Sequence, residues 1–170
     1  MNKFFITILA ALLILPAMAG FSDVQPIQRL IYMQGNEQLF SVDLSDIWNI
    51  EMENGDITGV SDDGKIWFYL GDIENKVDIE TAKDEINATM ARYFTNIEVV
   101  EKIEELDLNG LKAHALEGIA KQEGKDVIFF VLLFDLDTAD TGALIFIMDP
   151  AAERLHLGAM HNLTVSITRL

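Results

Sequence analysis

The sequence predicts an α+β fold in which helices cover both faces of an antiparallel β-sheet, as an α/β/α sandwich. Three observations lead to this prediction. Regularly spaced turn residues separate short runs with β-strand composition. Two segments have the three- and four-residue apolar spacing of amphipathic helices. Two further runs, 127–134 and 143–148, are apolar at every position, which indicates strands that are buried on both faces.

An export leader is the first element that the sequence predicts. Lys3 precedes a stretch that is almost entirely apolar, 4–15, and the small residues Ala17 and Ala19 follow at positions that suit signal peptidase. This stretch is shorter than the ~20 residues that a membrane-spanning helix needs, which disfavours the alternative of an uncleaved anchor. We therefore expect residues 1–19 to be a signal peptide. The mature protein is expected to be periplasmic or secreted, with no stable membrane insertion after cleavage.

The remaining chain is expected to form a lead-in segment, 20–38, and a single domain, 39–170, because no linker or internal repeat divides it. Turn residues such as Asp63-Gly64 leave only short connections between strands, and short connections favour antiparallel neighbours. The predicted strands are 39–44, 47–52, 56–60, 65–70, 99–108, 111–120, 126–135 and 143–148.

Two helices are expected to cover the sheet. Asp78 is suited to cap the first helix, because its carboxylate can accept a hydrogen bond from a backbone N–H group of the first turn. Asp149-Pro150 opens the second helix, since proline is well tolerated at the first helical position. The predicted apolar stripes contain Ile79, Ala82, Ile86, Met90 and Phe94 in the first helix and Ala152, Leu155, Ala159, Leu163 and Ile167 in the second.

The composition restricts the classes of partner. The chain has 170 residues, of which 28 are acidic and 12 are basic, so its formal charge is -16. This charge argues against nucleic acids and anionic lipids, which are polyanions. It is equally compatible with a basic patch on a protein partner and with a charge that only keeps the exported protein soluble. The sequence has no cysteine, which excludes disulfides, thiolate metal sites and a cysteine nucleophile.

We expect no catalytic residues and no enzyme activity. The Gly-x-Ser-x-Gly and His-Glu-x-x-His motifs are absent from the sequence, and the loop 118–126 lacks the glycine spacing of a phosphate-binding loop. His114, His156 and His161 do not have the spacing of a zinc site. We therefore interpret the three histidines as partly exposed side chains that are not coupled to other groups.

Calcium is the only cofactor that the sequence suggests. Asp135, Asp137 and Asp140 lie in one turn between two strands, and calcium prefers carboxylate oxygens as ligands. The turn does not match an EF-hand loop, because Ala139 occupies a position that needs an oxygen ligand. A weak calcium site and a solvated acidic turn both remain compatible with this pattern.

Three aromatic residues, Trp48, Trp67 and Tyr69, are candidate surface contacts. They lie in predicted strands, in which successive side chains point to opposite faces, so some of them belong to the core and others point away from it. A sugar-binding platform would also use such residues, but packing in the core is the more common role of large aromatic side chains.

The order of these elements resembles the PsbP-like fold. An early strand with Trp48, a hairpin and a long helix are followed by Leu-Asn-Gly-Leu at 108–111, a second hairpin, two apolar strands and a closing helix that ends in Ser166-Ile167. The resemblance covers residues 39–167, although the proline–tryptophan segment of the family is absent. It implies an interaction or accessory protein, as most members of the family are, and it implies no active site.

These observations predict an exported, non-catalytic domain that binds an envelope protein or assists assembly in the cell envelope. The alternative is a periplasmic module that binds a small ligand or calcium. An exposed apolar pocket would favour the alternative, whereas an exposed patch on a flat surface would favour protein binding.

Overall fold

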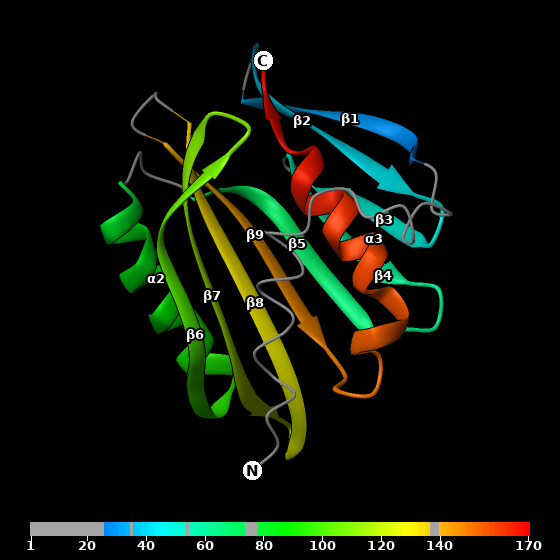
Figure 1. Ribbon diagram of the computed structural model, residues 1–170, viewed down its shortest axis with the longest axis vertical. Coiled ribbons are helices and arrows are strands. Elements are labelled where there is room, and N and C mark those ends of the chain that lie inside the picture. Colours follow the sequence, from blue (N-terminus) through cyan, green and yellow to red (C-terminus); the bar gives the residue numbers. More distant parts are fainter. Residues whose placement is uncertain (1–25, 35, 54, 74–77, 137–139) are drawn as a thin grey trace.

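Figure 1 shows the computed structural model, which describes residues 26–34, 36–53, 55–73, 78–136 and 140–170. The predicted signal peptide lies outside the described residues. Within them the chain forms two antiparallel sheets and two helices, which confirms the predicted α+β fold class. The elements are β1 (Pro26–Gln34), β2 (Glu37–Ser45), β3 (Trp48–Glu53), β4 (Asp56–Ser61), β5 (Ile66–Ile73), α2 (Ile79–Tyr93), β6 (Thr95–Leu108), β7 (Leu111–Gln122), β8 (Lys125–Asp135), β9 (Thr141–Met148), α3 (Glu153–Ser166) and β10 (Thr168–Arg169).

Seven strands form the larger sheet, in the order β3-β4-β5-β9-β8-β7-β6. The two runs that are apolar at every position form β8 and β9, which lie inside this sheet, as the sequence predicts. Adjacent side chains of β8 belong to different apolar clusters, since Phe130 lies in one cluster and Phe129 in the other. A strand that is packed on both faces has no position for a polar side chain, which explains its continuous apolar sequence.

Three strands form the smaller sheet, in the order β1-β2-β10. Phe40 of this sheet and Met160 of α3 share one apolar cluster with Phe130, so the smaller sheet and α3 pack together on one face of the larger sheet. Phe40 stacks on Tyr32, with ring centroids 4.7 Å apart, and meets Phe134 edge to face at 5.3 Å. Each fully buried side chain of this size contributes about 1.5–3 kcal/mol to stability. We call the face of the larger sheet that carries Phe130 the closed face.

Helix α2 packs against the other set of β8 side chains. Asp78 is its N-cap, because the carboxylate accepts a hydrogen bond from the backbone N–H of Thr81 at 2.8 Å, as the sequence predicts. Ala82 and Met90 of α2 share the second apolar cluster with Phe129 of β8. The larger sheet therefore has apolar side chains packed on both of its faces.

The N-terminal part of the described chain differs from the expectation. The expected lead-in segment contains strand β1, which pairs with β2 from Pro26, opposite Ser45, to Gln34, opposite Glu37. Its side chains do not alternate cleanly between apolar and polar, so the pattern that identifies a strand with one exposed face is missing. For this reason, the smaller sheet cannot be predicted from the sequence.

The second helix begins later than the sequence predicts. Asp149 lies in a turn before α3, where its carboxylate accepts a hydrogen bond from the backbone N–H of Ala151 at 2.8 Å. Leu163 of the predicted apolar stripe is buried, but Leu155 is 71% exposed and does not belong to the core.

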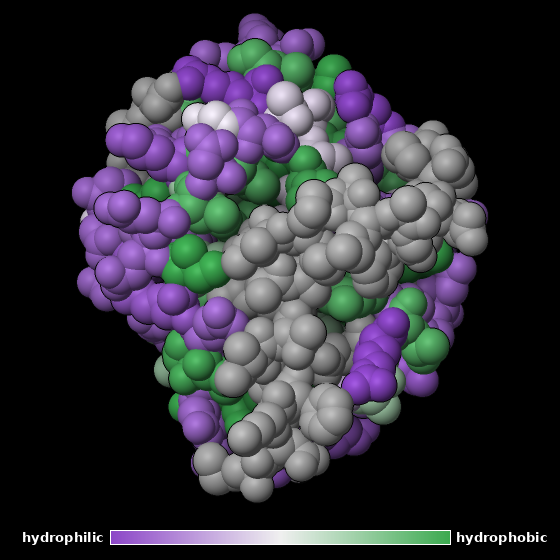
Figure 2. Space-filling model, in the orientation of Figure 1, coloured by the Kyte–Doolittle hydropathy of each residue, from purple (hydrophilic) through white to green (hydrophobic). Residues whose placement is uncertain are grey.

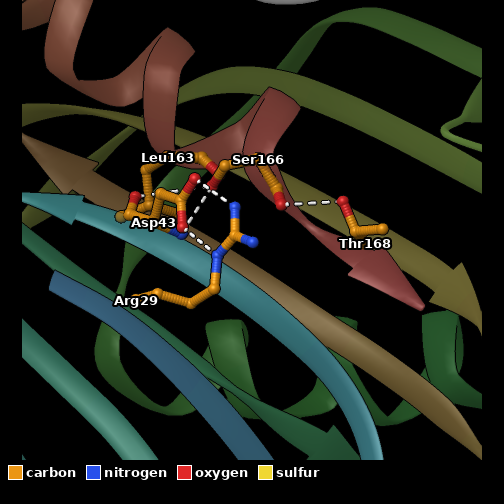
Figure 3. Close-up of polar contacts among 5 residues, drawn as sticks. All are labelled: Arg29, Asp43, Leu163, Ser166 and Thr168. Atoms are coloured by element: carbon orange, nitrogen blue, oxygen red, sulfur yellow. Dashed lines mark hydrogen bonds and ion pairs between the residues drawn. The ribbon is translucent and has the colours of Figure 1, made fainter. Parts of the chain in front are cut away.

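The C-terminal end of α3 is attached to the smaller sheet (Figure 3). The Ser166 hydroxyl accepts a hydrogen bond from the backbone N–H of Asp43 at 2.8 Å and donates one to the carbonyl of Leu163 at 2.7 Å. The Asp43 carboxylate in turn pairs with two nitrogens of the Arg29 guanidinium, at 2.6 and 2.8 Å. The hydrogen bond from Arg29 lowers the pKa of Asp43. These contacts join β1, β2 and α3.

Asn109, in the turn between β6 and β7, holds the same end of α3. Its side-chain amide donates hydrogen bonds to the carbonyls of Val165 and Ile167, both at 2.8 Å. The φ angle of Asn109 is 53°, in the left-handed region that asparagine adopts more readily than most residues. The Leu-Asn-Gly-Leu motif and the Ser-Ile motif therefore meet in space, and their shared role is to fix the end of this helix.

Candidate functional site

The candidate surface aromatics lie in different environments. Trp48 is only 6% exposed, and its ring meets Phe68 edge to face at 5.0 Å between centroids. Its position in β3 directs it into the closed face, which corrects the expectation that it is available at the surface. Trp67 is 38% exposed, and Tyr69 is half-buried.

Trp67 lies in a row of apolar residues that crosses three strands of the larger sheet. Antiparallel pairing places Val60 of β4 opposite Trp67 of β5, and Trp67 opposite Ile147 of β9. A second row is formed in the same way by Thr58, Tyr69 and Ile145. We define the open face as Thr58, Val60, Trp67, Tyr69, Ile145 and Ile147.

The open face is only partly covered. Ile147 and Tyr69 contact the apolar cluster under α2 and are half-buried. Among the described residues, Trp67 and Val60 belong to neither apolar cluster, and each is 38% exposed. The apolar cluster that contains α2 residues therefore does not extend to Val60 of β4 and Trp67 of β5, and these side chains are in contact with solvent.

A cluster of hydroxyl and carboxylate groups joins the two sheets beside the open face. The Tyr69 hydroxyl donates a hydrogen bond to Asp56 at 3.1 Å. Tyr32 of the smaller sheet contacts the Asp56 and Asp72 carboxylates, and the Gln34 amide donates to Asp72 at 3.1 Å. Burial and the hydrogen bond to Asp72 raise the pKa of Tyr32, so that its hydroxyl stays protonated and acts as a donor. This arrangement holds the sheets together.

His156 is coupled to Asp63, which corrects the interpretation of the histidines as uncoupled. The His156 Nε2 atom lies 3.0 Å from one carboxylate oxygen of Asp63, and the Ser61 hydroxyl donates to the other oxygen at 2.7 Å. These hydrogen bonds lower the pKa of Asp63, with that from His156 having the largest effect. A serine nucleophile needs the imidazole as its base. Here the serine contacts the carboxylate instead, so the geometry supports a structural role.

A recess lies where β6, β7 and β8 meet the α2 side of the sheet. Its lining is mostly apolar, with Lys83, Lys102 and His114 as polar members. Burial lowers the pKa of His114, and the two lysines form ion pairs with Glu80 and Glu104, each at 2.6 Å. The recess encloses about 220 Å³ even when open solvent is included, whereas ligand pockets have roughly 300–1,000 Å³. It gives no support to the small-ligand alternative.

The predicted calcium ligands are only partly described, because Asp137 lies outside the described residues. Asp135 is half-buried and Asp140 is 2% exposed, so Asp140 is not the solvated side chain of the alternative interpretation. The carbonyl of Asp140 accepts a hydrogen bond from the backbone N–H of Leu136 at 3.1 Å, which closes the turn. No three His, Cys, Asp or Glu side chains of the described part of the chain are grouped so that they could hold a metal. The calcium site stays a prediction.

Trp67 and Val60 are not the only exposed apolar side chains of the described chain, since Tyr93, Val99 and Leu155 are more exposed than either. In the view of Figure 2, hydrophilic side chains dominate the upper and left parts of the surface outside the grey residues. None of the described helices is long and apolar enough to cross a membrane. The open face is a candidate contact region because an exposed tryptophan and an exposed valine lie directly opposite each other on adjacent strands.

Comparisons with known proteins identify the fold. No protein-family model and no curated protein matches the sequence. Among solved structures, cyanobacterial PsbP (CyanoP) from Synechocystis sp. PCC 6803 is similar, with a TM-score of 0.59, 9% identity, and coverage of 92% of this chain and 99% of that one. LpqN, involved in cell envelope biogenesis of Mycobacterium tuberculosis, has a TM-score of 0.55, 12% identity, and coverage of 84% and 90% respectively. The chain thus has a PsbP-like fold, as the order of its elements indicates.

Proposed function

We propose that this chain is a non-catalytic domain of the cell envelope that binds a protein partner through the open face. Trp67 carries the proposal, because it is 38% exposed on a sheet surface and lies between Val60 and Ile147. Tryptophan is enriched among the residues that dominate binding free energy at protein interfaces. The open face is part of a sheet and not a pocket, which favours a protein over a small ligand.

Two observations support the location in the envelope. Residues 1–19 have the basic start, apolar stretch and small residues of an export signal. LpqN, which is similar in fold, is described as involved in cell envelope biogenesis. The partner is expected to carry basic residues, because this chain has a formal charge of -16.

The absence of catalysis is part of the proposal. The polar groups around Asp63 and those around Asp72 link separate elements of the fold by hydrogen bonds. We take the scaffold to be a sheet with one helix over each face, on which the exposed part of the α2 side is the binding surface. Fold alone assigns no chemistry, so the partner must be found by experiment.

Site-specific crosslinking in intact cells tests this function. A photoreactive amino acid is placed at Val60, and a matched control is placed at Leu155, which is 71% exposed on α3. We expect one protein to be captured from position 60 and not from position 155. After purification, that protein should bind the Trp67→Ala variant about 30-fold more weakly than the unchanged chain, as for an interface hot spot. Equal capture from both positions, or unchanged affinity of the variant, would contradict the proposal.

A further inference from the structure

The two edge strands of the larger sheet differ in regularity. Within the described residues, β3 and β6 each have one neighbouring strand and so form the two edges. The pairing of β6 with β7 has three register shifts, whereas β3 pairs with β4 without interruption, from Trp48 opposite Ser61 to Glu53 opposite Asp56. Bulges disturb the row of backbone groups at an edge and block the addition of a further strand, while a regular edge presents that row intact.

The side chains of β3 divide into an acidic face and an apolar face. Glu51 and Glu53 are exposed and alternate with Ile50 and Met52, because successive side chains of a strand point to opposite sides. Ile50 packs against the closed-face cluster, and Met52 is 58% exposed. The strand contains no proline, and its two charged side chains are both acidic, so they disfavour pairing with an acidic segment and favour a basic one.

We infer that the partner of the proposed function contributes an extended segment that adds to β3 as a further strand and in which basic residues alternate with apolar residues. Basic side chains of this segment lie beside Glu51 and Glu53, and its apolar side chains lie beside Ile50 and Met52. Cross-strand pairs of opposite charge stabilise a sheet, whereas like charges opposite each other destabilise it. Main-chain hydrogen bonds between β3 and the added strand supply the affinity, and the alternation of basic and apolar side chains in the added strand supplies the specificity.

This edge is continuous with the open face. Glu51 pairs with Thr58, and Thr58 pairs with Tyr69, so the acidic side of β3 extends the second row of the open face. A partner whose strand is added to β3 therefore places its basic side chains on the same side of the sheet as Trp67. One partner can occupy the edge and the open face together.

A labelled synthetic peptide, Lys-Val-Lys-Val-Lys-Val, tests the edge directly by fluorescence anisotropy with the purified protein. The double variant Glu51→Lys/Glu53→Lys should weaken binding about tenfold or more, because two favourable charge pairs become repulsive. The matched control, Glu98→Lys/Glu105→Lys, makes the same change of charge at exposed positions of β6 and should leave binding within about twofold. Equal weakening by both double variants would overturn the inference.

Backbone pairing is tested separately from charge. The same peptide with N-methyl groups on its backbone keeps every charge but loses the N–H donors, and we expect it to bind at least about tenfold more weakly. Hydrogen exchange of residues 48–53 should slow when the unmodified peptide binds, and exchange of residues 95–108 should not. Equal binding of the two peptides, absence of binding, or protection of β6 instead of β3 would each overturn the inference. The crosslinking from Val60 is independent of these results, so failure of the edge and failure of the proposed function can be told apart.

Discussion

The two faces of the larger sheet are built from the same strands but have different degrees of closure. In β5, Ile66, Phe68 and Leu70 point to the closed face and are fully buried. Trp67, between them in sequence, points to the opposite side and is 38% exposed. Side chains of α3 and of the smaller sheet share the apolar cluster of the closed face, whereas Trp67 and Val60 on the other side belong to neither apolar cluster.

Because of this difference, a single strand can contribute to stability through one face and to partner binding through the other. Side chains of one strand alternate between faces, so a substitution at one position affects one face and leaves the other in place. Substitutions on the closed face should act on stability, and substitutions on the open face should act on partner binding. The expected effects therefore differ in kind as well as in size.

The largest effect is expected from Phe130→Asp on the closed face. Phe130 is fully buried, and its ring centroid lies 6.1 Å from that of Phe146. The substitution removes a large apolar side chain, which costs about 3–5 kcal/mol, and buries an unpaired charge, so the total reaches the ~5–15 kcal/mol by which whole domains are stable. We expect no folded protein by circular dichroism. Trp67→Asp, the matched change on the open face, should retain the native spectrum, and equal loss of structure in both variants would remove the distinction between the faces.

The next effect concerns the attachment of α3, whose buried side chains belong to the closed-face cluster. Asn109→Gly tolerates the φ angle of 53° but removes the two hydrogen bonds to Val165 and Ile167, so we expect a loss of about 1–3 kcal/mol. Asn109→Ala adds the strain of a left-handed residue, about 1–2 kcal/mol more. Urea unfolding measures both changes. An alanine variant as stable as the glycine variant would show that the turn relaxes out of the left-handed conformation.

The sequence predicts the parts of the fold in which one physical requirement dominates. Runs 127–134 and 143–148 are apolar at every position and become the strands inside the sheet, because only burial on both faces permits such a sequence. Asp78 is predicted as an N-cap and is one, because capping depends on residues close in sequence. Strand β1 is not predicted, because its apolar residues do not alternate with polar ones. Its extended conformation depends on pairing with β2, which local sequence does not reveal.

The candidate site is less predictable, because it depends on contacts between residues far apart in sequence. From the sequence, Trp48 and Trp67 are both candidate surface contacts. Only the register of β3 and β5 with their neighbouring strands shows that Trp48 is in the core and that Trp67 is exposed. The pairing of His156 with Asp63 joins residues 93 positions apart, and no local spacing signals it. No sequence pattern distinguishes Val60, and only the pairing of β4 with β5, which places it opposite Trp67, identifies it as part of the open face.

A smaller effect on stability is expected from Trp67→Ala on the open face. The indole is partly in contact with solvent and lies outside both apolar clusters, so truncation should cost about 1 kcal/mol or less in urea unfolding. Partner affinity should nevertheless fall about 30-fold, as described above. A loss of stability as large as that of a buried aromatic residue would show that the open face belongs to the core.

The smallest effect is expected at Asp63, which links the β4–β5 turn to α3 through His156 at a site that solvent reaches. Hydrogen bonds from His156, Ser61 and the backbone of Lys65 lower its pKa below the ordinary value of 3.8, so the unfolded chain binds a proton more readily than the folded chain. The contribution of Asp63 to stability is therefore complete above about pH 5 and is lost as the pH falls below about 4.

Asp63→Asn should consequently be less stable than the unchanged protein at about pH 6, and the difference should shrink progressively as the pH falls below about 4. The control Asp62→Asn makes the same change of charge in the same turn without breaking the contact to His156, so its difference from the unchanged protein should not follow this profile. Denaturant unfolding at several pH values measures both differences. A pH-independent difference for Asp63→Asn would mean that the link between the turn and α3 depends on packing around His156 and not on the charge of Asp63.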